Sequence, residues 1–315
     1  MNILSLHPLR DAQIATIKAA RPDIELQLAK AQDCASYLPD AEILLAFGQT
    51  NLAPILPQAP KLRWVQALTA GVDGFIALDA FRESDILLTN VRGIHGIPIA
   101  EHVLGMMLSR TRGLLAAHDN QKNRSWKGLR GVDELYGKTA AVVGLGSVGG
   151  VIANRLKAMG MTVLGVKQSK TEEPDVDKLY TPDALFDVLP QADFIIVTLP
   201  LTPETQNLFS KKAFEAMKPT AFFVNVARGP IVNEADLADA LRSGVIGGAG
   251  LDVFCEEPLP ENSPLWDVPN LLITPHHAAT SPRYMERAVE VFVENLKAYP
   301  DISKMKNIID KERGY

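Results

Sequence analysis

The chain has 315 residues, of which 47% are hydrophobic and 22% charged, and its net charge is −5 at pH 7. This length allows two domains with separate cores, and the acidic balance without a basic tract argues against nucleic acid or an anionic membrane as a partner. The two cysteines, Cys34 and Cys255, lie far apart and indicate a reducing compartment rather than a disulfide framework. The N-terminus is typical of a first strand, not of a signal peptide, so we expect a cytoplasmic protein.

The first part of the chain alternates between short strands and helices. A helix is predicted over residues 11–20, and strands over 2–6, 24–28, 41–47, 62–66 and 86–90. The alternation predicts a small α/β unit over residues 1 to about 95. A long helical pattern follows over 99–115, and the stretch 120–133 is polar and mixed, typical of a loop or an irregular helix.

A second α/β unit is predicted from Gly137 onwards. Its expected strands are 140–143, 162–166, 194–199, 221–226, 248–253 and 271–274, and its expected helices are 147–159, 183–188, 211–217 and 234–243. Repeated alternation of this kind predicts a parallel, doubly wound sheet that binds ligands at the carboxyl ends of its strands. A closing helix is expected over 285–296, with a tail, 301–315, that folds back on the first domain.

The segment 144–149, Gly-Leu-Gly-Ser-Val-Gly, lies between a predicted strand and a predicted helix. In this context the first glycine makes a tight turn, the second lets the backbone approach a pyrophosphate, and the third lets helix and strand pack closely. A diphosphate would then bind the N–H groups at the helix N-terminus. The pattern predicts a dinucleotide site at Gly144, Gly146, Ser147, Val148 and Gly149, although a glycine turn that only packs a helix on a strand has the same pattern.

The end of the next strand bears on the choice of dinucleotide. An acidic residue about 20 positions after the glycines would bind the adenosine ribose of NAD. Lys167, Gln168 and Ser169 stand at that place instead, with Lys170 close by. A lysine and a hydroxyl attract a 2′-phosphate, which favours NADP over NAD, but solvated lysines that admit either cofactor would give the same sequence.

Three further segments place reactive side chains after predicted strands. They carry Arg228, then Asp252 with Glu256 and Glu257, then His276 with His277. An arginine can bind a carboxylate, a histidine can transfer a proton, and a glutamate beside that histidine would stabilise the imidazolium. Taken singly, each has a structural explanation as a surface arginine, a turn cap or a strand-end histidine. Taken together, they describe hydride transfer between a nicotinamide and an α-keto acid.

At these residues the chain resembles the D-isomer-specific 2-hydroxyacid dehydrogenase family, over most of its length. The similarity covers residues 144–149, 198–205, 225–229 and 251–260, and Pro275-His276. It implies two doubly wound parallel-sheet (Rossmann-like) domains with a cleft between them, here 1–98 plus 283–315 for substrate and 99–282 for the dinucleotide. It also implies a homodimer and no metal.

The resemblance also assigns roles to residues. Arg228, Glu257 and His276 match the family's catalytic residues, which decides between the neighbouring glutamates and histidines. Ala70, Gly71 and Val72, with Arg228, match its substrate-binding positions. The matching cofactor contacts beyond the glycine turn are Leu199, Pro200, Val226, Ala227, Asp252, His276 and Ala278.

The expected activity is NAD(P)-dependent reduction of a small 2-keto acid such as glyoxylate, hydroxypyruvate or a branched keto acid. Two alternatives remain at this point. One is a dinucleotide-sensing, corepressor-like binding protein, which can keep the same three catalytic residues. The other is a phosphoglycerate dehydrogenase without a regulatory domain, in which Arg63 and Arg92 would meet the phosphate.

Overall fold

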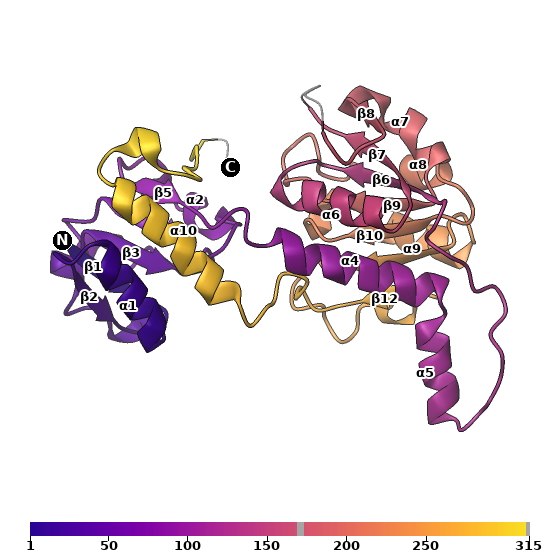
Figure 1. Cartoon of the computed structure of the whole chain (residues 1–315), viewed down its shortest axis with the longest axis horizontal. Coiled ribbons are helices and arrows are strands. Elements are labelled where there is room, and N and C mark those ends of the chain that lie inside the picture. The colour runs from indigo at the N-terminus through magenta and orange to yellow at the C-terminus, as the bar shows by residue number, and fades with distance from the viewer. Residues whose placement is uncertain (169–172, 313–315) are drawn as a thin grey trace. The chain divides into compact units, whose positions relative to one another are not determined.

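The computed structural model describes residues 1–168 and 173–312 of the chain. Two compact units are present, one formed by Met1–Ile94 with Ser281–Tyr315 and the other by His95–Thr280 (Figure 1). The chain passes from one unit to the other at positions 94/95 and 280/281, a few residues before the predicted bounds. Each contains one fully parallel sheet, which confirms the predicted fold class of two parallel α/β domains.

The first unit is built on five parallel strands in the order β2-β1-β3-β4-β5. Their bounds are β1 (Asn2–Ser5), β2 (Glu25–Leu28), β3 (Ile43–Ala46), β4 (Trp64–Ala67) and β5 (Leu87–Thr89). All four residues of β3 and of β4 are buried, as expected for central parallel strands that are covered on both faces.

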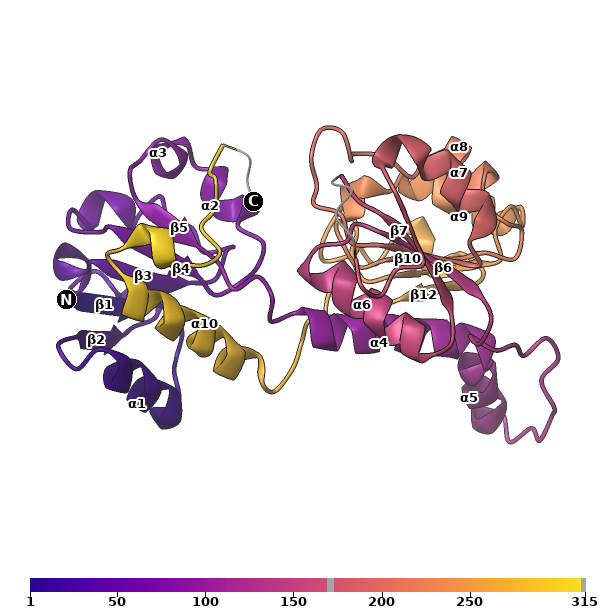
Figure 2. The same cartoon turned by 45° about the horizontal axis from the view of Figure 1, so that its top comes forward.

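Each face of this sheet has its own helical cover. Helices α1 (Asp11–Ala20) and α10 (Tyr284–Ala298) lie side by side and bury Ile17 and Phe292 against Trp64 (Figures 1 and 2). The short helices α2 (Asp73–Ile76) and α3 (Asp79–Arg82) contribute Phe75 and Phe81 to the opposite layer. The sequence had not predicted these two helices, which are too short to show a periodic pattern.

The C-terminal tail folds back on the first unit, as predicted. Ile309 donates its N–H to the carbonyl of Leu88 at 2.9 Å, and Ile308 pairs antiparallel with Thr89. Because Ile309 is buried, this segment covers the β5 edge with apolar contact as well as hydrogen bonds.

The second unit is built on seven parallel strands in the order β12-β11-β10-β9-β6-β7-β8. Their bounds are β6 (Thr139–Val143), β7 (Thr162–Val166), β8 (Lys178–Tyr180), β9 (Phe194–Val197), β10 (Phe222–Asn225), β11 (Gly248–Leu251) and β12 (Leu271–Ile273). The order reverses between β6 and β9, so the carboxyl ends of these strands form the switch point at which such sheets bind ligands.

Helices cover both faces of this second sheet. Helices α4 (Gly96–Thr111) and α6 (Ser147–Ala158) pack side by side on one face (Figures 1 and 2). Helices α7 (Leu185–Val188), α8 (Lys211–Glu215) and α9 (Glu234–Arg242) cover the other. The covering explains why Phe194-Ile195-Ile196-Val197 is apolar without alternation.

The structure differs from the sequence prediction in two places of this unit. The pattern over 99–115 belongs to two helices, α4 and α5 (Leu114–Lys122), which are separated by Gly113 in the left-handed conformation at φ 63°. A glycine adopts this φ without steric cost, so the chain can change direction there. Strand β8 was missed, since three residues give too short a pattern to read.

Candidate active site

Three neighbouring strands of the second sheet supply the residues that the sequence singled out. Arg228 follows β10, Asp252 and Glu257 follow β11, and His276 follows β12. Since β10, β11 and β12 are adjacent and parallel, their carboxyl ends lie at one edge of the sheet. Segments that are separated by 19 residues or more in sequence therefore meet there.

His276 and Glu257 form a direct contact. The Nδ1 atom of His276 lies 2.6 Å from Oε2 of Glu257, while Oε1 of Glu257 accepts the N–H of Phe254 at 2.9 Å. A carboxylate accepts hydrogen bonds, so Nδ1 carries the proton and Nε2 is the ring nitrogen available to a substrate. The imidazole remains 52% exposed, which leaves room for a reactant.

The rival residues have other surroundings. Glu256 is exposed, whereas Glu257 makes the contact to the histidine. His277 donates its backbone N–H to Asp252 and packs its ring edge-on against His102, with 5.1 Å between the ring centroids. The geometry thus pairs the same glutamate and histidine that the resemblance had indicated.

Arg228 lies on a turn that is fixed by close backbone packing. Its carbonyl accepts a hydrogen bond from Asn225 Nδ2 at 3.0 Å, and its Nη1 donates to the carbonyl of Ala227 at 2.8 Å. A Cβ on the next residue, Gly229, would lie 1.9 Å from the carbonyl carbon of Phe254. Position 229 must therefore be a glycine for the Arg228 turn to pack directly against the backbone at Phe254, which leads to Glu257.

The glycine turn between β6 and α6 fits a dinucleotide. Gly144 has φ 102°, and a Cβ on Gly149 would lie 1.9 Å from the carbonyl oxygen of Gly144, so these two glycines close the turn. By contrast, a Cβ on Gly146 would meet nothing within 4 Å, which leaves its backbone open to a ligand. Ser147 begins α6, and Val148 follows, so their N–H groups belong to the first turn, where anions bind.

The remaining predicted cofactor residues lie at the same edge of the sheet. Leu199 and Pro200 follow β9, Val226 and Ala227 follow β10, and Ala278 follows β12. Ala227 and Ala278 are buried, and Pro200 is exposed.

Lys167 follows β7 and is held in the sheet by its N–H, which donates to the carbonyl of Tyr180 at 3.0 Å. Its ammonium forms an ion pair with Glu173, a contact that the sequence had not indicated. Gln168 is exposed. Ser169 and Lys170 lie outside the described residues.

The predicted substrate loop, Ala70 to Val72, belongs to the first unit. Thr69 Oγ1 donates to the carbonyl of Gly71 at 2.7 Å, Asn90 Nδ2 donates to that of Ala70 at 2.7 Å, and Tyr284 donates to that of Leu68 at 2.8 Å. The loop is therefore held by its carbonyls. Within the described residues, the N–H groups of Ala70, Gly71 and Val72 donate no hydrogen bond, so they could bind an anion.

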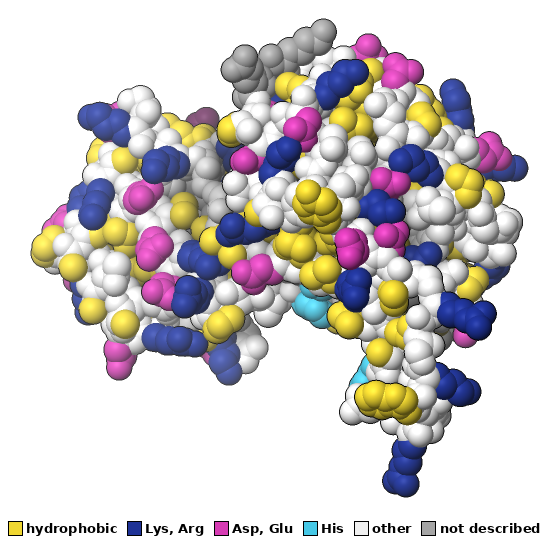
Figure 3. Space-filling model, turned by 45° about the vertical axis from the view of Figure 1, so that its right-hand side comes forward, with side chains coloured by type: hydrophobic (Ala, Val, Ile, Leu, Met, Phe, Trp, Pro, Cys, Tyr) yellow, Lys and Arg dark blue, Asp and Glu magenta, His cyan; other side chains and the backbone are white. Residues whose placement is uncertain are grey.

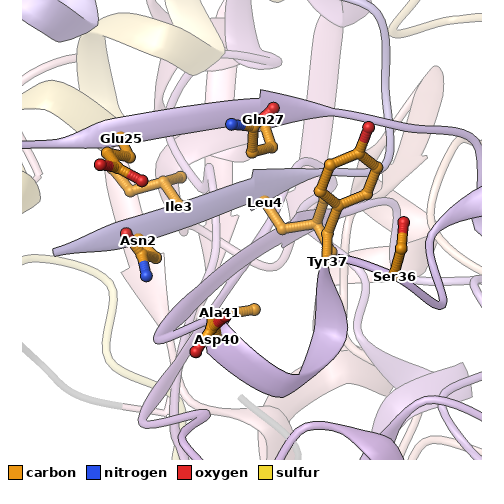
Figure 4. Close-up of a pocket in the computed structure, with 9 residues that line it drawn as sticks. All are labelled: Asn2, Ile3, Leu4, Glu25, Gln27, Ser36, Tyr37, Asp40 and Ala41. Carbon is orange, nitrogen blue, oxygen red and sulfur yellow. The ribbon is translucent and has the colours of Figure 1, made fainter.

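Each unit carries a surface hollow that the candidate catalytic residues do not line. One, of about 150 Å³, borders β1 and β2 and is lined by polar side chains such as Glu25 and Asp40 (Figure 4). The other, of about 430 Å³, lies between α6 and residues 173–176 and reaches Leu145 of the glycine turn. Neither is lined by Arg228, Glu257 or His276.

In the described part of the chain, no helix combines the length and apolar character needed to cross a membrane. In residues 1–168 and 173–312, no three His, Cys, Asp or Glu side chains are grouped so that they could hold a metal ion.

A family model, described as the D-isomer specific 2-hydroxyacid dehydrogenase NAD-binding domain, matches residues 104–278. This match spans more than half of the chain and includes the glycine turn and all three candidate catalytic residues. The chain belongs to the D-isomer specific 2-hydroxyacid dehydrogenase family.

Similar proteins agree with this membership. D-3-phosphoglycerate dehydrogenase of Mycobacterium tuberculosis is 34% identical over 90% of this chain, but this chain spans only 54% of that protein. A D-isomer specific 2-hydroxyacid dehydrogenase family protein from Aeromonas salmonicida is 40% identical, with a TM-score of 0.90 over 98% of this chain and 99% of that one. An NADPH-dependent glyoxylate/hydroxypyruvate reductase from Sinorhizobium meliloti, solved with NADP and sulfate, is 28% identical, with a TM-score of 0.84 over 100% and 99%.

Several polar residues around the site of this family member were missed from the sequence. His95 is buried beside Arg228; burial, with the guanidinium second, lowers the pKa of His95 to about 4. His102 and Thr274 contact each other near Asp252, and Glu173 pairs with Lys167. None of these belongs to a motif, and only the folded chain brings each of them to its partner.

Proposed function

We propose that this protein is an NAD(P)H-dependent reductase that converts a small 2-keto acid to the D-2-hydroxy acid, with Arg228, Glu257 and His276 as its catalytic residues. The observation that carries the proposal is the 2.6 Å contact of His276 Nδ1 with Glu257, at the carboxyl edge of the dinucleotide-binding sheet. We assign substrate binding to the unit of residues 1–94 and 281–315, and dinucleotide binding to residues 95–280.

The positions of the two imidazole protons assign the roles of His276 and Glu257. A bound nicotinamide supplies the hydride that reaches the carbonyl carbon. His276 gives the proton on Nε2 to the oxygen that becomes the hydroxyl, while Glu257 accepts the Nδ1–H bond and stabilises the imidazolium before transfer. In the oxidative direction the same nitrogen takes the proton back.

Substrate binding is assigned to Arg228 and to the loop Ala70–Val72. The planar guanidinium can bind a carboxylate through two parallel hydrogen bonds, or polarise the keto oxygen. Backbone N–H groups of the loop add donors for the carboxylate. The preference for a small acid is supported by the similarity to the Sinorhizobium meliloti glyoxylate/hydroxypyruvate reductase.

The direct test compares His276→Ala and Arg228→Ala with wild type on glyoxylate, hydroxypyruvate, branched 2-keto acids and 3-phosphohydroxypyruvate. Loss of a general acid lowers turnover about 10²–10⁴-fold, so we expect kcat of His276→Ala to fall by at least about 100-fold. Arg228→Ala is expected to lose most of its kcat/KM, because the guanidinium that would bind the keto acid is gone. Wild-type turnover in both variants would disprove the assigned mechanism. Tight dinucleotide binding without turnover of any acid would instead support a corepressor-like protein, and preference for the phosphorylated acid would support a phosphoglycerate dehydrogenase.

The cofactor we propose is NADP in preference to NAD, bound by the glycine turn and by Leu199, Pro200, Val226, Ala227, Asp252, His276 and Ala278. Support for the preference comes from Lys167, which places a cation after β7, and from Gln168 and Ser169 beside it. Glu173 pairs with that cation, so a 2′-phosphate has to displace a carboxylate. A phosphate carries more charge than a carboxylate and competes well for a lysine.

The cofactor proposal is tested by measuring kcat/KM with NADPH and with NADH. We expect Lys167→Asp to lower the NADPH value and to raise the ratio in favour of NADH. Glu173→Gln is the matched change, since it removes the competing carboxylate and is expected to strengthen NADPH binding. A wide preference of wild type for NADH would overturn this assignment.

We also propose a homodimer in a reducing compartment such as the cytoplasm. Helix α5 and the loop after it project from the rest of their unit (Figure 1). Apolar side chains are exposed on this projecting part (Figure 3), and they include Leu114, Leu115, Trp126 and Val132. Such a patch is costly to leave in water, and a second copy of the chain would cover it. Cys34 and Cys255 are both unpaired, as in a reducing compartment.

Light scattering coupled to gel filtration tests the dimer. Trp126→Glu is expected to give a monomer, and Trp266→Glu, an exposed tryptophan outside the patch, is the control. A monomeric wild type at micromolar concentration would contradict the proposal.

A further inference from the structure

The segment that carries His276 is held in place by Asp252. Oδ1 of this buried carboxylate accepts the N–H of His277 at 3.0 Å, and Oδ2 accepts that of Ala278 at 2.9 Å. The backbone carbonyl of Asp252 accepts the N–H of His276 itself at 2.8 Å. Asp252 therefore bonds the backbone at His276 and at the two residues after it.

His276 needs such support because its backbone is strained. Its φ is 48°, in the left-handed region, which a residue with a Cβ adopts only where its surroundings hold it. A change in the position of Asp252 would release this conformation and move the imidazole away from Glu257.

Thr274 connects Asp252 to helix α4. The Thr274 hydroxyl lies 2.6 Å from Oδ1 of Asp252 and 3.1 Å from Nε2 of His102. A hydroxyl has one proton, and the short bond to the carboxylate takes it, so Oγ1 must accept from His102. The direction of hydrogen-bond donation is then fixed, because His102 Nε2–H donates to Thr274 and Thr274 donates to Asp252.

The surroundings of His102 favour this neutral, donating form. Its side chain is 15% exposed, and Nε2 lies 3.8 Å from Oδ1 of Asp252. Burial lowers the pKa of His102 and the nearby His277 adds to this, while Asp252 opposes it. The ring of His277 packs against that of His102, so the helix also contacts the residue next to His276.

We propose that His102 is a positioning residue for His276, which acts through Thr274 and Asp252 to hold the 274–278 segment in its strained conformation. The inference rests on the proposed function in one respect, the acid–base role of His276. His102 itself bonds Thr274, not the candidate catalytic side chains, so its loss should lower kcat with little change in KM for the keto acid.

The experiment uses pairs of variants in the full-length protein. His102→Leu and Thr274→Val each interrupt the hydrogen bonds that link His102 to Asp252, and each is expected to lower kcat about tenfold. The double variant is expected to be no slower than Thr274→Val, because both substitutions interrupt the same series of hydrogen bonds. His102→Gln, whose amide can donate from the same place, and Thr274→Ser are expected to stay within about threefold of wild type. Thr111→Val is the control. It removes the hydrogen bond from the Thr111 hydroxyl to the Met107 carbonyl within α4, which does not involve the 274–278 segment.

Hydrogen exchange of the backbone amides at 276–278 gives a readout that does not depend on turnover. We expect faster exchange there in His102→Leu and Thr274→Val, and wild-type exchange in His102→Gln. Equal exchange in wild type and both disrupted variants would overturn the inference, as would an unchanged kcat in those variants. A wild type without activity on any keto acid would overturn the proposed function, and the exchange data would still decide whether His102 holds the segment.

Discussion

At the scale of single residues, the histidines in and around the site differ in how deeply they are buried. His276 is half exposed, whereas His95 is only 6% exposed and His102 is largely buried. Desolvation disfavours the imidazolium, so the buried rings stay neutral as the pH falls. The buried rings therefore act as neutral polar groups, while the exposed ring of His276 is accessible to a reactant.

The pKa of His95 makes stability depend on pH. Its value is about 4 in the folded chain and 6.5 when unperturbed, so between these limits the unfolded chain binds more protons. The contribution of His95 is fully present above pH 6.5 and is lost as the pH falls towards 4, by about 3 kcal/mol in the free energy of unfolding. Burial lowers the pKa values of His7 and His102 too, so they act in the same direction.

Urea unfolding at pH 7 and pH 4.5 tests this dependence. His95→Leu is expected to lose less stability between the two pH values than wild type, because it removes the group that the unfolded chain would protonate. His118→Leu, a change at an exposed histidine of α5, should keep the wild-type difference. An identical pH difference in wild type and His95→Leu would show that His95 is not responsible.

At the scale of elements, the β6–α6 turn uses its glycines for different purposes. Gly149 is needed for packing, since a Cβ there would lie 1.9 Å from the Gly144 carbonyl oxygen, whereas a Cβ on Gly146 would point into open space. These surroundings agree with the different roles that the sequence motif predicts for its second and third glycines.

Two alanine variants separate these purposes. Gly149→Ala is expected to lower the free energy of unfolding by about 2 kcal/mol or more, because the backbone must move. Gly146→Ala is expected to change stability by less than about 1 kcal/mol and to weaken dinucleotide binding at least about tenfold. Denaturant unfolding and fluorescence titration with NADPH measure the two effects, and a Gly146→Ala protein with wild-type affinity would contradict the proposed pyrophosphate site.

At the scale of the whole molecule, the first unit is made from both ends of the chain. Residues 1–94 supply its sheet, but α10 covers one face, with Phe292 fully buried and 5.3 Å from the Trp64 ring, and the tail pairs with β5. The second unit is continuous from His95 to Thr280 and contains its own sheet and helices. The two units should therefore differ in their ability to fold alone.

Fragment expression tests this asymmetry. Residues 95–280 are expected to fold and to bind the dinucleotide, while residues 1–94 alone should lack a fixed tertiary structure because Trp64 and its neighbours lose their cover. Two-dimensional NMR spectra of both fragments provide the measurement, with full-length protein as the control. A dispersed spectrum from residues 1–94 would contradict this expectation.

The sequence by itself determined the parallel α/β class, nearly all the longer elements and the strand ends at which Arg228, Glu257 and His276 lie. These features depend on local periodicity and on glycine spacing, which a single segment can reveal. The family resemblance added which glutamate and which histidine belong together.

Only the tertiary structure decided which side chains meet. The contact of His276 with Glu257 spans 19 positions and that of His102 with Thr274 spans 172, and both depend on the strand order and on how α4 packs on the sheet. The pairing of Lys167 with Glu173, the burial of His95 and the use of Asp252 to hold a strained loop have the same origin. Local patterns specify the elements, whereas burial and hydrogen-bond partners are properties of their assembly.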